Sequence, residues 1–124
     1  MVPFCQKYSL GVIPWAPLAG GILTGKYRHG EAAPPGTRLA GPTFGASHKI
    51  RDEFWSKIPG LQAFASERGH TVAELAIAWL LAHPWIPTVI AGARKPEQVE
   101  ANAAAVGWKL TDAELAQLND IRPL

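Results

Sequence analysis

The chain has 124 residues, 48% hydrophobic and 18% charged, which is the composition of one ordinary globular domain. A formal net charge of +2 is too weak and too scattered to indicate a nucleic-acid partner. No apolar run approaches the roughly 18 residues of a membrane span, and the first residues do not have the pattern of a signal peptide. Cys5 is the only cysteine, which excludes an internal disulfide or a cysteine-built metal site and fits a reducing cytoplasm.

The N-terminal third predicts one short strand followed by a long irregular loop. Phe4 and Tyr8 have the spacing of the last turn of a helix. The apolar run Gly11–Trp15 predicts a strand, which the prolines around it keep short. The Pro- and Gly-rich stretch Ala16–Gly45 predicts a loop, and a loop of this length in a compact domain is usually functional or disordered.

Residues 50–68 have helical spacing, with one apolar face made by Phe54, Ile58, Leu61 and Ala65. Pro59-Gly60 interrupts this pattern, so we expect two helical pieces or a kink there. Gly69 is a typical residue after the end of a helix.

The clearest predicted element is the next helix. Thr71 and Glu74 have the spacing of a capping box, in which each side chain satisfies a backbone N–H group of the first turn. Pro84 ends the helix. One apolar stripe follows the capping box, and we interpret it as core: Val72, Leu75, Ala76, Trp79 and Leu80.

The last third repeats the order of strand and helix. Thr88–Ala91 predicts a second buried strand parallel to the first, and Pro96 suits the first position of a helix that runs to about Val106. Thr111–Glu114 is a second capping box before a final short helix. Alternating strands and helices imply an α/β fold with a parallel sheet. Two parallel strands leave unpaired edges, so we expect a part of a larger structure.

Four stretches, in this order and covering nearly the whole chain, resemble the aldo-keto reductase family: GVIPWAPLAGGILTGKY, TVAELAIAWLLAHP, PTVIAGARKPEQVEAN and KLTDAELAQLNDI. The resemblance implies a (β/α)8 TIM barrel of roughly 250 residues or more. It covers only the last quarter of that barrel, the seventh and eighth βα units with the C-terminal helix. Residues 1–124 are then the incomplete C-terminal portion of one such domain.

The resemblance also implies residues that bind the cofactor after the first strand. Trp15 matches the aromatic ring that stacks on nicotinamide, with Ala16 following it, and the backbone from Leu18 through Gly20 and Gly21, with Lys26, matches the segment that wraps the pyrophosphate. Without the resemblance, Trp15 is a core aromatic residue that closes a strand, and Lys26 is a solvated lysine.

At the end of the second strand, Gly92, Arg94 and Gln98 match the segment that meets the adenosine 2′-phosphate, which favours NADPH over NADH. Asn102 matches a residue that contacts adenine, whereas Ala101 departs from the usual Glu beside it. The alternative is that Arg94 is a solvated arginine and that the two amides lie on an exposed helix face.

The family's catalytic Tyr, Lys, Asp and His come from the first half of the barrel, so no catalytic residue is carried over. Tyr8 and Tyr27 do not match the donor tyrosine. Four histidines lack any pairing for acid–base or metal chemistry and are interpreted as structural or exposed: His29, His48, His70 and His83. Four further tryptophans are interpreted as core and docking surface: Trp55, Trp79, Trp85 and Trp108.

Three functions remain open. The chain is the cofactor-binding part of an NADPH-dependent reductase of aldehydes or ketones that is completed by a missing N-terminal half, a non-catalytic dinucleotide-binding module, or a structural fragment that self-associates. Substrate identity is not readable, because only residues 28–47 are candidates for contact with a small carbonyl substrate. We expect the isolated chain to be marginally stable, since its helices lack the rest of their sheet.

Overall fold

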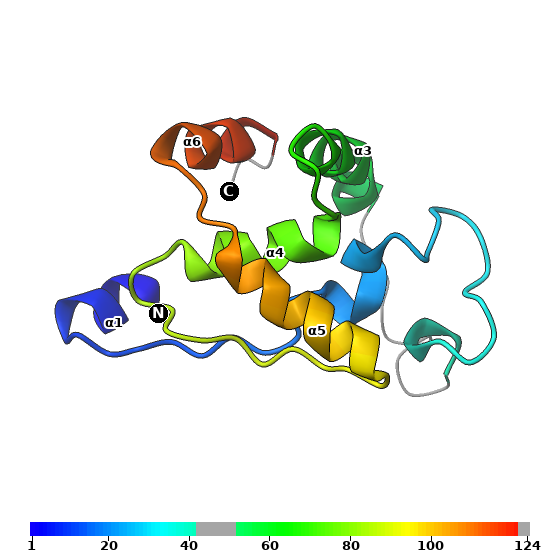
Figure 1. Ribbon diagram of the computed structural model, residues 1–124, viewed down its shortest axis with the longest axis horizontal. Coiled ribbons are helices and arrows are strands. Elements are labelled where there is room, and N and C mark those ends of the chain that lie inside the picture. Colours follow the sequence, from blue (N-terminus) through cyan, green and yellow to red (C-terminus); the bar gives the residue numbers. More distant parts are fainter. Residues whose placement is uncertain (42–51, 122–124) are drawn as a thin grey trace.

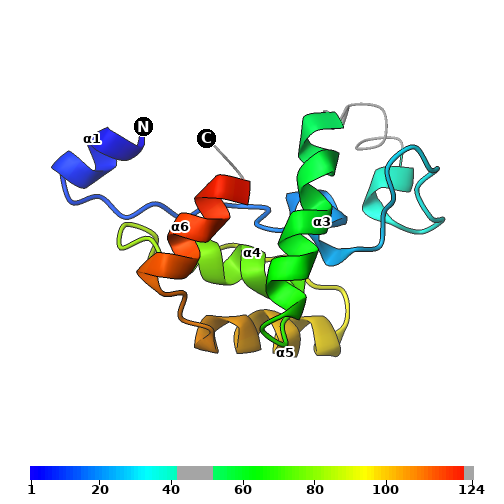
Figure 2. The ribbon, with the colours of Figure 1, turned by 90° about the horizontal axis from the view of Figure 1, so that it is seen from above.

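The computed structural model describes residues 1–41 and 52–121. Its elements follow one another as α1 (Val2–Lys7), η1 (Ala19–Thr24), η2 (Arg38–Ala40), α3 (Asp52–Ser66), α4 (Val72–Leu81), α5 (Pro96–Ala104), η3 (Ala105–Gly107) and α6 (Asp112–Ile121). Helix α4 lies at the centre and is contacted by α3, α5, η1 and η3 (Figure 1). Seen from above, α3 and α6 lie on one side of α4 and α5 on the other, while α1 lies at the far end (Figure 2).

The two predicted strands run side by side, but no strand forms in the described residues. Trp15 and Ile90 make a single isolated bridge in parallel orientation, in which the Ile90 N–H donates to the Pro14 carbonyl at 2.9 Å. The Val12 N–H donates to the Trp85 carbonyl at 2.7 Å. The predicted parallel direction is therefore confirmed, whereas the predicted two-stranded sheet is not confirmed. Pro14 has no N–H to donate, and a pair of such short segments has no third strand beside it to extend the ladder.

The extended segments are apolar on both faces, and only one face is covered. Val12 and Pro14 are half-buried towards the helices, as are Val89 and Ala91 on the second segment. The alternate positions are exposed: Ile13 at 55%, Trp15 at 74% and Ile90 at 59%. This alternation is the period of two of a pleated segment, so the chain keeps strand-like side-chain directions without a strand ladder.

Helix α4 begins at the predicted capping box. The Glu74 N–H donates to the Thr71 hydroxyl at 3.2 Å, and the Thr71 N–H donates to the Glu74 carboxylate at 2.7 Å. The predicted apolar stripe does not contain every buried residue of α4, because Ile77 and Ala78 outside it are also buried. Helix α4 is apolar nearly all round, which is expected of a central helix with other elements around it.

Most of the predicted stripe does not lie in a closed core. Leu75 is buried at 3% exposure, whereas the rest of the stripe is half-buried. The whole stripe lines an open hollow of about 610 Å³, bounded also by Trp15 and Pro17, by Phe54 and Leu61 of α3 and by Leu118 of α6.

Helix α3 is continuous through Pro59, so the expected division into two pieces is wrong. A proline inside a helix removes one backbone hydrogen bond, but burial of the residues around it holds the helix together. Ile58 and Phe64 are buried at 8% and 2% exposure. Gly60 has a packing role, because a Cβ atom there would lie 3.1 Å from the Ile121 Cγ2 atom of α6.

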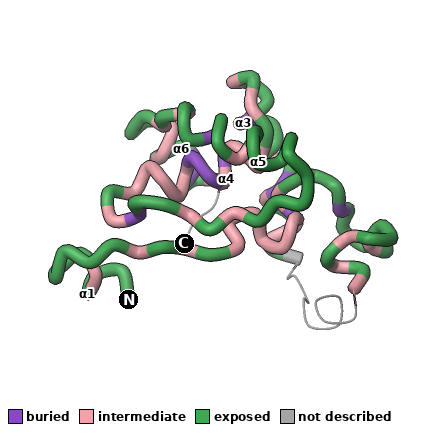
Figure 3. The backbone as a smooth tube through the Cα atoms, turned by 60° about the horizontal axis from the view of Figure 1, so that its bottom comes forward, coloured by how far each residue is buried: buried purple, intermediate pink, exposed green. Residues whose placement is uncertain are grey.

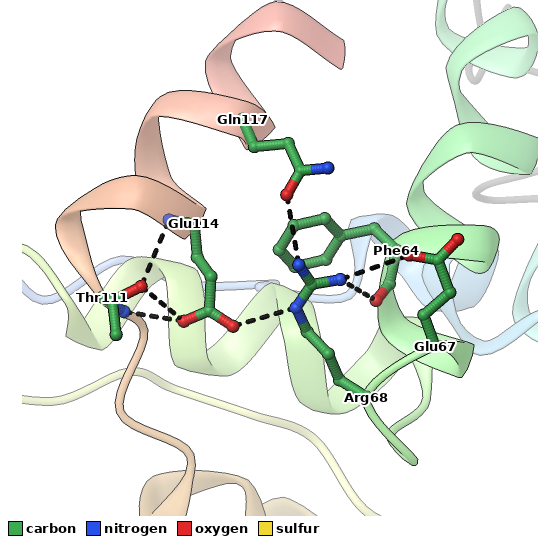
Figure 4. A network of polar contacts seen from close by, with 6 residues as sticks. All are labelled: Phe64, Glu67, Arg68, Thr111, Glu114 and Gln117. Atoms are coloured by element: carbon green, nitrogen blue, oxygen red, sulfur yellow. Dashed lines mark hydrogen bonds and ion pairs between the residues drawn. The ribbon is translucent and has the colours of Figure 1, made fainter.

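A polar network joins the end of α3 to the start of α6 (Figure 4). Arg68 Nε donates to the Glu114 carboxylate at 2.9 Å and Nη2 donates to Gln117 at 3.1 Å. The guanidinium also lies 3.7 Å from the centre of the Phe64 ring. Glu114 closes the second predicted capping box, where it accepts from the Thr111 N–H at 2.8 Å. The main core lies beneath this network and contains Phe64, Ala65, Leu75 and Leu118.

A second, smaller core forms around the loop after the first extended segment. Ile22 and Tyr27 pack there against Ile58 of α3, with Phe54 and Trp55 partly buried at its edge. Buried residues concentrate on α4 and in these two cores, while α1 and most of α5 are exposed (Figure 3). The Phe4 and Tyr8 rings of α1 pack on each other at 4.7 Å, which confirms the predicted helical turn.

Three of the tryptophans interpreted as core or docking surface, Trp55, Trp79 and Trp108, pack against the two cores, and Trp85 contacts a histidine. His70 stacks on Trp108 with ring centres 4.0 Å apart, and His29 stacks on Trp55 at 5.7 Å. His83 contacts both Trp79 and Trp85. These three histidines therefore have structural roles, whereas His48 lies outside the described residues.

Candidate cofactor-binding site

The single parallel bridge fixes where the two candidate loops emerge. Because Trp15 and Ile90 pair in parallel, the residues that follow each of them leave at the same edge. The loop that begins at Ala16 and the turn that leads to Arg94 are therefore neighbours. A hydrogen bond between them, from Arg94 Nη1 to the Gly36 carbonyl at 3.3 Å, shows the same proximity.

The loop after Trp15 has an unusual backbone. Ala16 and Ala19 have φ of 55° and 48°, although neither is glycine, and strained backbone of this kind clusters at functional sites. Gly20 and Gly21 follow with φ of 68° and 101°. Glycine adopts this left-handed backbone without the steric penalty of a Cβ atom. Leu18 lies at the start of η1, where its carbonyl accepts from the Gly21 N–H at 2.8 Å.

Lys26 lies directly across Gly21. A Cβ atom on Gly21 would stand 2.8 Å from Lys26 Cε and 2.9 Å from Nζ, so no larger residue fits there without moving the lysine. The ammonium group lies 5.2 Å from the centre of the Tyr27 ring. The structure thus brings together the glycine backbone and the lysine that the family resemblance assigns to the pyrophosphate.

Arg94 and Gln98 are joined at the start of α5. The Arg94 N–H donates to Gln98 Oε1 at 2.8 Å, which closes the turn before Pro96 at the first helical position. Gln98 therefore uses its carbonyl oxygen internally and keeps its amide N–H groups as donors. Gly92 is exposed, and nothing lies within 4 Å of a Cβ atom built there.

The predicted residues do not line one common cavity. Trp15 and Ala16 line the 610 Å³ hollow beside α3 and α4. Asn102 lines a separate hollow of about 380 Å³ between α4 and α5. Gln98, Arg94 and Lys26 are exposed. The described residues therefore form two neighbouring surfaces, one from the loop after Trp15 and one from the turn around Arg94, and no enclosed pocket.

The residue types on these two surfaces are suited to the phosphate groups of a dinucleotide. Two cationic side chains, a glycine pair with left-handed backbone next to Lys26, and the start of a nine-residue helix all suit an anion. The exposed indole of Trp15 suits a flat ring.

Sequence reasoning missed the residues that connect these groups. The Gly36 carbonyl holds Arg94, and Tyr27 holds the loop that carries Gly36, since its hydroxyl accepts from the Leu39 N–H at 3.3 Å. Burial pushes the Tyr27 pKa upwards, but hydrogen bonding with Thr37 and Leu39 and the nearby Lys26 charge outweigh burial and lower that pKa. Pro35-Gly36 is a recognisable turn pattern, but no local pattern shows which distant side chain its carbonyl meets.

Among residues 1–41 and 52–121, no cluster of His, Cys, Asp or Glu is arranged to hold a metal ion. Within the same residues, no helix is long and apolar enough to cross a bilayer.

Residues 1–123 match the Aldo/keto reductase family. The chain belongs to this family. It is 38% identical over 107 residues to a probable voltage-gated potassium channel subunit beta of Arabidopsis thaliana, covering 85% of this chain and 32% of that protein. It is 33% identical over 119 residues to the L-glyceraldehyde 3-phosphate reductase of Escherichia coli O157:H7, covering 92% of this chain and 34% of that protein.

The fold resembles part of a solved barrel. The glycerol dehydrogenase of Gluconobacter oxydans matches with a TM-score of 0.73 and 29% identity, over 98% of this aldo-keto reductase chain and 36% of that one. The family and this neighbour support the (β/α)8 fold. The chain spans about a third of the length of these relatives. The isolated bridge and the helices around it therefore correspond to part of such a barrel.

Proposed function

We propose that this chain supplies the cofactor-holding part of an NADPH-dependent aldo-keto reductase that reduces aldehydes or ketones to alcohols. When bound, the nicotinamide supplies the hydride that reaches the carbonyl carbon. The residues of this chain bind and orient the cofactor. Trp15 stacks on the nicotinamide, Lys26 and the glycine backbone hold the pyrophosphate, and Arg94 holds the 2′-phosphate. Asn102 contacts the adenine.

The observation that carries this proposal is the parallel bridge between Trp15 and Ile90. It sends the glycine loop and the Arg94 turn to the same edge, and the Arg94–Gly36 hydrogen bond joins them there. In TIM barrels the active site lies at this C-terminal end of the strands, with phosphate groups commonly held after strands seven and eight.

A titration of the purified chain with NADPH, followed by tryptophan fluorescence, tests the proposal. Saturable quenching that is weaker with NADH is the expected result. Arg94→Ala should weaken NADPH binding by at least about tenfold, because a hydrogen bond to a charged group contributes about 1.5–3 kcal/mol. Lys109→Ala is the matched control, since it removes the same charge from an exposed position outside the proposed site.

Circular dichroism on the same samples separates loss of binding from loss of fold. A folded chain that does not quench with NADPH would contradict the proposal. Quenching that is equal for NADPH and NADH and unchanged by Arg94→Ala would contradict the role of Arg94 and the choice of NADPH.

A second candidate is a nucleotide-binding subunit that does not turn over substrate. The relatives from Arabidopsis thaliana, Oryza sativa and Schizosaccharomyces pombe, at 38%, 39% and 35% identity, are described as voltage-gated potassium channel beta subunits. This similarity favours a regulatory function as the alternative to turnover.

A chimaera distinguishes the two candidates. This chain replaces the C-terminal third of the Escherichia coli L-glyceraldehyde 3-phosphate reductase, and carbonyl-dependent oxidation of NADPH is measured. The reductase proposal predicts turnover that Arg94→Ala weakens. A folded chimaera that binds NADPH without turnover would favour the regulatory candidate.

A further inference from the structure

A small turn stands between the second core and Arg94. The Thr37 N–H donates to the Pro34 carbonyl at 3.2 Å, which places Pro35 and Gly36 at the centre of a four-residue turn. Gly36 has φ of 75°, and a proline followed by a left-handed glycine is the pattern of a type II turn. The Thr37 hydroxyl reinforces the turn by donating to the same carbonyl at 2.6 Å.

One side of this turn is anchored in the second core. Tyr27 is only 7% exposed and packs against Ile22 and Ile58. Its hydroxyl accepts the Leu39 N–H, three residues beyond Gly36. Leu39 itself packs on the same core. The position of the turn is therefore set by a buried side chain.

The other side of the turn meets Arg94. The Gly36 carbonyl accepts from Nη1, while the backbone N–H of Arg94 is held by Gln98. Both the main chain and the guanidinium of this exposed residue therefore have a hydrogen-bond partner. A guanidinium has five N–H donors in a rigid fork, so one bond to Gly36 leaves the others for a ligand.

We propose that Tyr27 is a positioning residue for nucleotide selectivity: through the turn at Gly36 it pre-orients the Arg94 guanidinium towards the 2′-phosphate of NADPH. This inference rests on the proposed cofactor function. A long side chain that is already oriented loses less conformational freedom on binding. NADH has no 2′-phosphate, so the orientation of Arg94 affects NADPH alone.

The test variant is Tyr27→Phe, which keeps the ring in the core and removes only the hydroxyl. NADPH and NADH affinities are measured by fluorescence titration of the full chain. The dissociation constant for NADPH should rise by about two- to tenfold, the worth of one hydrogen bond, and that for NADH should stay within about twofold. Tyr8→Phe is the matched control, since Tyr8 is the other tyrosine and is 56% exposed on α1.

A second variant acts on the turn without touching the core. Gly36→Ala strains a left-handed position in open space, so it should shift the carbonyl and lower the preference for NADPH in the same way. In the double variant Tyr27→Phe with Arg94→Ala, the first change should add no further loss, because both act through one contact.

The outcomes separate the two proposals. A wild-type chain that binds neither nucleotide would refute the cofactor site and the role of Tyr27 with it. A chain that prefers NADPH through Arg94, yet keeps that preference in Tyr27→Phe and Gly36→Ala, would refute the positioning role alone. Equal losses for both nucleotides would show that Tyr27 acts through the fold or through the neighbouring Lys26 and not through Arg94, which also overturns the proposal.

Discussion

The helices around α4 and the two extended segments differ in how completely their hydrogen bonds and apolar contacts are formed. Around α4, two capping boxes, a buried core and the Arg68 network fix α3 and α6 against each other. At the opposite side, two extended segments meet at one bridge and expose Ile13 and Ile90. The difference shows that a helix forms its hydrogen bonds within its own segment, whereas a strand depends on its neighbours.

The largest contrast is expected from truncation of one buried and one exposed side chain. Leu75→Ala should lower the free energy of unfolding by about 2–5 kcal/mol, since it leaves a cavity in the main core. Ile90→Ala should change it by less than about 0.5 kcal/mol, because Ile90 is 59% exposed. Urea unfolding measures both, and equal losses would show that the extended side is packed as tightly as the helical side.

Removal of Arg68 should have an intermediate effect. Arg68→Ala breaks the bonds to Glu114 and Gln117 and the contact with Phe64, at a cost of about 1–2 kcal/mol. Arg28→Ala, a change of the same size at an exposed arginine, should have no measurable effect on the unfolding midpoint. A midpoint for Arg68→Ala that matches this control would mean that α3 and α6 are held by apolar packing alone.

The same network predicts a dependence of stability on acid. The Thr111 backbone N–H leads the interactions that lower the pKa of Glu114 below 4.5, with the Thr111 hydroxyl and Arg68 adding to it against burial. A depressed pKa in the folded state adds stability above the unfolded pKa, and this stability is lost as the pH falls through the folded value. Glu114→Gln should therefore flatten the decline in stability below about pH 4.5.

Glu67→Gln is the control for this pH profile, because its side chain is 68% exposed and lies 3.6 Å from Arg68. Its profile should follow the wild type. Glu74 also has a lowered pKa, so Glu114→Gln should leave part of the decline in place. An unchanged profile in Glu114→Gln would exclude this carboxylate as a source of acid sensitivity.

The smallest effect on stability is expected on the exposed face of the two extended segments. A change there should also affect self-association. Ile13→Lys places a charge where the side chain is 55% exposed, so folding should change little. If that face drives self-association, the mass measured by sedimentation should fall towards the monomer. A self-associated mass that is the same in wild type and variant would locate the association elsewhere.

Sequence patterns predicted the helices because their start and stop residues are local. Thr71 and Thr111 each marked a capping box that the structure contains. The division of α3 at Pro59 was wrong and the alternative of a kink there stays a prediction, because the effect of Pro59 depends on the packing of Ile58 and Phe64, which no local pattern reveals. The parallel direction of the extended segments was predicted correctly, but the predicted sheet is not confirmed, since the short segments around Pro14 form one bridge and no ladder.

The candidate site was predictable in parts. The glycines with left-handed backbone and the helix that begins at Pro96 follow from residue type alone. The roles of Trp15, Arg94 and Asn102 came from family resemblance and stay predictions. The bond between Arg94 and Gly36 joins residues 58 positions apart, so only the folded chain could reveal it.

Glu114 serves the cap of α6 and the contact with Arg68 through one carboxylate. The start of this ten-residue helix is therefore tied to a partner 46 residues earlier in the chain. Docking of α6 on α3 thus orders the side chain that caps α6, and the formed cap in turn favours docking. Such reciprocity makes the last helix fold together with the rest of the chain, so α6 should unfold in the same transition as α3.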